Sequence, residues 1–152
     1  MCTVCIQAKH KQKFIRVQVK RTSKPVELVH TDECGSFSTP SFGGNKHFIP
    51  FVDDYTRFTF VCMLPDKKSE TCTTAYKSFQ ARVAAMGQGY QFKQFRCDNG
   101  RGEYANKTFR SELTTRGATC EPCTPYSHHK DEVAGRMIRT ITEKARSMMI
   151  DS

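Results

Sequence analysis

Two aspartates in this sequence each follow a short run in which apolar residues alternate with polar ones. Asp32 lies in "LVHTDECG" and Asp98 lies in "FRCDNGRGEY". Such alternation predicts β-strands, so both carboxylates are expected at strand ends. There they could share Mg²⁺, which prefers hard oxygen ligands, and two such ions about 4 Å apart support phosphoryl transfer. Alternatively, each aspartate only begins a turn, because Asp-Glu-Cys-Gly and Asp-Asn-Gly are good turn sequences.

A third candidate region is "YSHHKDEVAGRMIRTITEKARSMM", residues 126–149, which is typical of a loop that enters a basic amphipathic helix. Asp131 and Glu132 stand in its first turn, where carboxylates meet free N–H groups and the positive end of the helix dipole. Gly135 follows them, and a glycine there costs the helix up to about 1 kcal/mol relative to alanine. The local pattern gives no reason for this glycine.

The same helix carries two stripes of side chains. The apolar stripe is expected to be its core face and contains Val133, Met137, Ile141, Ala145 and Met148. The polar stripe contains Arg136, Arg139, Glu143 and Arg146, and Lys130 precedes the helix. This stripe is either a solvated face with an Arg139–Glu143 ion pair, or a surface that contacts the phosphates of a DNA strand.

The bulk composition limits the class of protein. A chain of 152 residues supports one compact domain, and 38% hydrophobic residues with 11 Phe indicate a globular chain. The formal net charge of +9 favours a polyanionic partner, most simply nucleic acid. No apolar run approaches the roughly 20 residues of a transmembrane helix, so no membrane partner is expected. We expect a soluble, intracellular protein whose eight cysteines are reduced thiols or metal ligands.

Two C-x-x-C pairs raise the question of zinc. Cys2 and Cys5 have metal-ligand spacing, but a structural zinc needs four ligands. Cys120 and Cys123 could complete a four-cysteine site, yet these pairs come from elements with no reason to meet. Zinc binding is therefore not expected.

Hydrophobic periodicity predicts eight elements after a basic, patternless segment at residues 1–24. Strands are expected in "VELVHTDECG", "HFIPFV", "FTFVCML", "YQFKQFRCDNG" and "ATCEPC", and helices at 67–86, 103–116 and 133–149. The order β-β-β-α-β-α-β-α predicts an α/β fold with a mixed five-stranded sheet flanked by helices. The ribonuclease H-like fold has this order.

Three blocks of the sequence occur in register with one known family. "HTDECGSFSTPSFGGNKHFIPFVDDYTRFTFV", "FRCDNGRGEYANKTF" and "TPYSHHKDEVAGRMIRTITEKARSMM" together resemble the integrase core of copia-type retrotransposons, over residues 25–149. "CTVCIQAKHKQKF" is similar to the end of the zinc-binding segment that precedes that core. The resemblance implies a basic arm at 1–24, a remnant of that segment, and a catalytic-core-like domain at 25–152.

The resemblance implies a nuclear enzyme that binds the ends of the element and joins them to target DNA, with possible self-association into multimers. Two aspartates and one glutamate would hold two Mg²⁺ or Mn²⁺ ions, and Asp32 and Asp98 match the two aspartates. The glutamate of the family falls in a stretch similar to Asn-Gly-Val-Ala-Glu-Arg, and Gly135 occupies its position here. Pro50 is a second departure, because it removes a hydrogen bond from a strand that the family makes internal.

These departures leave three hypotheses open. The first is an integrase core, truncated at both ends, that binds nucleic acid through Lys130 and the arginines of the polar stripe but has impaired catalysis. The second is an active polynucleotidyl transferase in which Glu132, one turn before Gly135, is the displaced third catalytic carboxylate. The third is a non-enzymatic module for interaction with nucleic acid or protein.

Overall fold

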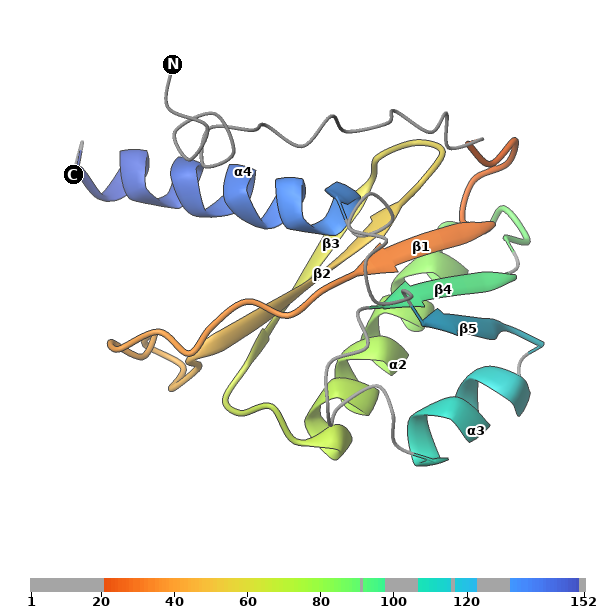
Figure 1. The fold of residues 1–152 in the computed structure, drawn as a ribbon, viewed down its shortest axis with the longest axis horizontal. Coiled ribbons are helices and arrows are strands. Elements are labelled where there is room, and N and C mark those ends of the chain that lie inside the picture. Colours follow the sequence, from red (N-terminus) through yellow and green to blue (C-terminus); the bar gives the residue numbers. More distant parts are fainter. Residues whose placement is uncertain (1–20, 91, 98–106, 116, 123–131, 151–152) are drawn as a thin grey trace, which may run out of the picture.

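The computed structural model describes residues 21–90, 92–97, 107–115, 117–122 and 132–150 (Figure 1). The strands are β1 (Leu28–Thr31), β2 (His47–Asp53), β3 (Thr59–Leu64), β4 (Gln94–Cys97) and β5 (Thr119–Pro122). The helices are α2 (Ser69–Ala85), α3 (Lys107–Thr115) and α4 (Glu132–Ile150). All eight elements confirm the order predicted from periodicity. No helix among these residues is long and apolar enough to cross a bilayer.

The five strands form one mixed sheet in the order β3-β2-β1-β4-β5. The first three strands pair antiparallel, as consecutive strands joined by short turns do. β4 then pairs parallel with β1, and β5 pairs parallel with β4. Each parallel step follows a helix, because a parallel strand needs a crossover connection.

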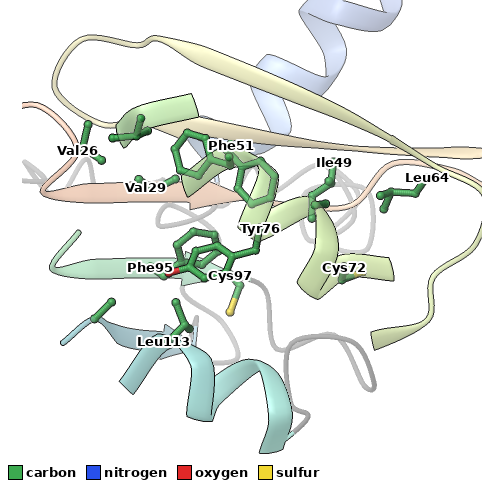
Figure 2. Close-up of a cluster of buried hydrophobic side chains, with 14 residues drawn as sticks. Val26, Val29, Ile49, Phe51, Leu64, Cys72, Tyr76, Phe95, Cys97 and Leu113 are labelled. Atoms are coloured by element: carbon green, nitrogen blue, oxygen red, sulfur yellow. The ribbon is translucent and has the colours of Figure 1, made fainter. Parts of the chain in front are cut away.

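Helices cover the two faces of the sheet unequally. Helices α2 and α3 lie on one face and α4 lies on the other (Figure 1). The main core fills the α2 face, where the ring of Phe51 on β2 stacks on Phe79 of α2 at 4.8 Å between centroids. Tyr76 meets Phe95 of β4 edge-on at 5.4 Å (Figure 2). This core holds the strands, and therefore the strand ends, in fixed positions.

The predicted apolar core face of α4 is wrong for the second half of the helix. Val133, Met137 and Ile141 are partly buried, but Ala145 and Met148 are exposed. The helix packs against β2 and β1 mainly through its first turns (Figure 1). Periodicity identifies an apolar stripe, but only the extent of the facing sheet determines how much of that stripe is buried.

The sheet accommodates Pro50 without breaking β2. Phe48 and Cys34 exchange two backbone hydrogen bonds of 2.9 Å, so the backbone groups of Phe48 face the β1 side. Pro50 lies two residues further and faces the same side. Pairing with β1 begins only at Phe51, opposite Thr31, so the missing N–H falls in a gap between strands. The hydrogen bond lost at Pro50 therefore falls only in that gap, and β2 pairs with β3 without interruption.

Candidate functional site

The parallel register of β1 and β4 places the carboxyl-terminal ends of both strands side by side. We call this end of the sheet the carboxylate edge. Thr31, the last residue of β1, lies opposite Cys97, the last residue of β4. Asp32 directly follows Thr31, and Asp98 directly follows Cys97 in the sequence but lies outside the described residues. Carboxyl ends of neighbouring parallel strands are where open α/β sheets bind ligands. The fold therefore directs the two chain segments that carry these aspartates to a common edge.

Asp32 directly follows β1 in a segment that forms no turn, because Cys34 pairs with Phe48 just beyond it. One of its carboxylate oxygens accepts the backbone N–H of Glu33 at 2.8 Å, and its side chain is partly exposed. Burial and the nearby charge of Asp32 raise the pKa of the Cys34 thiol, and the neighbouring Thr142 of α4 acts in the opposite direction. Helix α4 thus contacts the loop that carries Asp32. The interpretation of Asp32 as the start of a turn is therefore wrong, and its role as a metal ligand stays a prediction.

Gly135 lies in the first turn of α4 and is exposed. A Cβ added at this position would meet no neighbouring atom within 4 Å outside the helix's own local backbone. Its φ is not among the positive values found at other glycines, so the backbone does not require glycine either. The position could carry a longer side chain without displacing its surroundings.

Glu132 begins α4 and is held by an ion pair. Its carboxylate contacts the guanidinium of Arg136 one turn later, and its side chain is half exposed. Glu132 lies in the first turn as the sequence predicts. Its ion pair with Arg136 competes with any use of Glu132 as a metal ligand. Both residues also line a cavity between α4 and the sheet.

The polar stripe of α4 faces solvent. Arg136, Arg139 and Arg146 are all exposed, and Lys130 lies outside the described residues. Among the side chains that the structure places, Arg139 and Glu143 form no ion pair, so the predicted i,i+4 pair is wrong. Arg139 and Arg146 remain available for a partner.

Sequence reasoning missed a buried polar cluster on the α4 face. The Nε2 atom of His30 lies 3.0 Å from Oδ1 of Asp54, and Nη1 of Arg57 lies 3.4 Å from the same oxygen. Asp53 accepts the N–H of Thr56 at 2.9 Å in the hairpin turn between β2 and β3. Asp54 lies in the same turn, and its side chain points to His30. One signal was available: His30 lies two residues before Asp32, on the same face of β1.

Burial governs the titration of this cluster. It lowers the pKa of His30, although Asp54 acts in the opposite direction. Burial alone would raise the pKa of Asp54, but the N–H of Thr22, the imidazole of His30 and the charge of Arg57 hold it below its ordinary value. At neutral pH the pair is therefore a neutral imidazole that donates to a carboxylate.

The donor chemistry at the strand ends fits a divalent cation incompletely. Within the described ranges, no three His, Cys, Asp or Glu side chains gather into a metal-holding group. Asp32 offers hard oxygens suited to Mg²⁺ or Mn²⁺, and Asp98 would add a second carboxylate. Gly135 offers no side-chain ligand. For zinc, Cys2, Cys5 and Cys123 lie outside the described residues, and the Sγ of Cys120 lies 3.1 Å from the Sγ of Cys97.

Comparison with known proteins places this geometry in context. The model of the family described as "Integrase core domain" matches residues 6–128. The chain is 34% identical over 148 residues to the retrovirus-related Pol polyprotein from transposon TNT 1-94 of Nicotiana tabacum. That alignment covers 97% of this chain but only 11% of the polyprotein.

Two solved structures share the fold. A chain of the simian T-cell lymphotropic virus intasome, solved in complex with PP2A regulatory subunit B56 gamma, matches with a TM-score of 0.74 and 15% identity. This match covers 99% of the present chain and 51% of the intasome chain. The catalytic core domain of BIV integrase matches with a TM-score of 0.58 and 14% identity, over 84% of this chain and 74% of that one. At these identities the matches establish a common architecture.

Proposed function

The chain belongs to the integrase core domain family and corresponds to a part of a retrotransposon Pol polyprotein; from that premise, we propose that it is a DNA-binding core with impaired catalysis. Integrase cores bind DNA and generally depend on divalent metal ions. The DNA bound here would be the ends of the element and its target. We further propose a nuclear site of action and self-association, with residues 1–24 as a basic arm beside a core at 25–152.

The observation that supports impairment is the identity of residue 135. Gly135 stands in the first turn of α4, the helix that packs against β2 and against β1, the strand that Asp32 follows. Asp32 and Asp98 would hold a Mg²⁺ or Mn²⁺ ion, whose role when bound is to stabilise charge on the oxygens of a reacting phosphate. Without a third carboxylate, a second ion would be poorly held. Because each 1.36 kcal/mol of lost stabilisation costs a factor of ten, the rate falls by several orders of magnitude.

The rival function is an active transferase that uses Glu132 as the third ligand. The ion pair with Arg136 argues against it, because the carboxylate would have to leave a guanidinium to reach a metal. It is nevertheless the described α4 carboxylate nearest to Gly135 in sequence.

A DNA nicking and joining assay with Mg²⁺ or Mn²⁺ tests the proposal directly. We expect the unmodified chain to show no metal-dependent product above a no-metal control. Glu132→Ala should leave that baseline unchanged. Clear turnover by the unmodified chain that Glu132→Ala removes would establish the rival function, whereas turnover that survives Glu132→Ala would contradict both.

DNA binding by the polar stripe predicts a specific response to salt. Arg139→Gln and Arg146→Gln should each weaken DNA binding and reduce the slope of log K against log salt by about 1, because each removes one phosphate contact. Fluorescence anisotropy with a labelled duplex at several salt concentrations measures both quantities. Arg82→Gln is the matched control, since Arg82 is exposed at the end of α2 on the opposite face. Equal effects of all three substitutions would mean that only net charge matters.

A further inference from the structure

A cavity of about 360 Å³ lies between the first turns of α4 and the sheet, outside the carboxylate edge described above. Its floor is one row of neighbouring residues across three strands, in which Arg96 of β4 pairs with His30 of β1 and His30 pairs with Val52 of β2. Its roof is formed by Glu132, Val133, Arg136, Met137 and Thr140 of α4. The volume lies at the lower end of the range of small-molecule sites, about 300–1,000 Å³.

The charge that lines this cavity is mainly positive. Four arginines and two carboxylates contribute to the lining: Arg21, Arg57, Arg96, Arg136, Asp54 and Glu132. Both carboxylates already have partners. Asp54 accepts from His30 and from Thr22, and Glu132 is paired with Arg136. Arg57 shares Asp54 with His30, and Arg96 is paired with Glu121 outside the lining, so the arginines of the lining still outnumber its carboxylates by two.

Arg96 carries unused donors at the floor of the cavity. The residue is only 9% exposed. Its Nη2 lies 3.0 Å from Glu121, but its Nε and Nη1 are buried and find no hydrogen-bond partner among the residues that the structure describes. Nη1 of Arg57 is also buried and makes no hydrogen bond, although it lies 3.4 Å from Oδ1 of Asp54 as an ion pair. Buried guanidinium donors without acceptors destabilise a fold, so their presence around a cavity indicates a ligand that supplies acceptors.

We propose that this cavity binds a phosphate group, held by an unpartnered N–H donor of Arg96 and by Arg57. A phosphate presents several acceptor oxygens and a negative charge, which match the paired N–H groups of arginine. The imidazole of His30 holds Asp54 through the 3.0 Å contact between their side chains. The phosphate is either a free ion or a phosphodiester of nucleic acid, and the second source rests on the DNA binding proposed above.

Titration with inorganic phosphate at constant ionic strength, followed by calorimetry, tests the site without reference to DNA. We expect saturable binding by the unmodified chain. Arg57→Gln and Arg96→Lys should each raise the dissociation constant by about tenfold, because each removes a charge-assisted hydrogen bond. Arg82→Gln should leave it unchanged. Absence of saturable binding, or equal loss in Arg82→Gln, would overturn the proposal.

Two further measurements keep the result interpretable. Arg96 is buried and Arg96→Lys could disturb folding, so its thermal melt is compared with that of Arg57→Gln, which changes a side chain that is 34% exposed. DNA binding is then measured with saturating phosphate against chloride of equal ionic strength. Specific competition assigns the site to a phosphodiester, and phosphate binding without competition assigns it to a free ion. If DNA does not bind at all, the calorimetric titration still decides the site.

Discussion

Gly135→Glu is expected to raise metal-dependent DNA nicking or joining by about a thousandfold or more over the unmodified chain. The substitution adds the third carboxylate at the position in α4 that the family motif gives to glutamate, and a thousandfold corresponds to about 4 kcal/mol. The position has room, because a Cβ there meets no neighbouring atom within 4 Å beyond the local helix. The same variant should bind Mn²⁺ about tenfold more tightly, which electron paramagnetic resonance measures independently of turnover.

Gly135→Gln is the matched control for this gain. Glutamine has nearly the same size and helix propensity as glutamate, so both variants should stabilise α4 by several tenths of a kcal/mol. Only glutamate supplies the charge that a second ion needs. Asp32→Asn in the Gly135→Glu background should remove the gain. If Gly135→Gln equals Gly135→Glu, or if neither variant binds Mn²⁺ more tightly than the unmodified chain, residue 135 is not the missing ligand.

Phe79→Ala should lower the free energy of unfolding by about 3–5 kcal/mol, as removal of a buried aromatic ring does. Phe79 is 1% exposed and stacks on Phe51, with the ring of Phe92 at 5.4 Å and that of Phe60 at 5.9 Å. For a domain of this size the melting temperature should fall by about 6–20 °C. Urea unfolding followed by far-UV circular dichroism gives the free energy.

Phe42→Ala provides the reference for this effect, because Phe42 is fully exposed in the loop before β2. It should change the free energy of unfolding by less than about 0.5 kcal/mol. A loss below about 1 kcal/mol for Phe79→Ala would show that the α2 face of the sheet is not the main core. Phe79→Ala is expected to lower the free energy of unfolding more than Phe42→Ala only because Phe79 is buried and Phe42 is exposed.

The sequence by itself determined the elements and the family. Alternating strands and helical stripes depend on residues close in the chain, so all eight elements could be predicted from local patterns. The departure at Gly135 was also visible in the sequence, because it is a matter of residue identity at a motif position. The sequence could not show that this position has room for a side chain, because that depends on which atoms surround the first turn of α4.

Only the tertiary structure decided which polar groups meet and which apolar groups are covered. His30 lies beside Asp54 and Arg96, which are 24 and 66 residues away, because three strands pair in one register. No local pattern encodes that register, and a shift of one residue would send each side chain to the other face. The second half of α4 is exposed for a reason that is also tertiary: the helix packs on the sheet only through its first turns. Local periodicity thus specified each element, and strand pairing specified the edge that carries Asp32 and the cavity beneath α4.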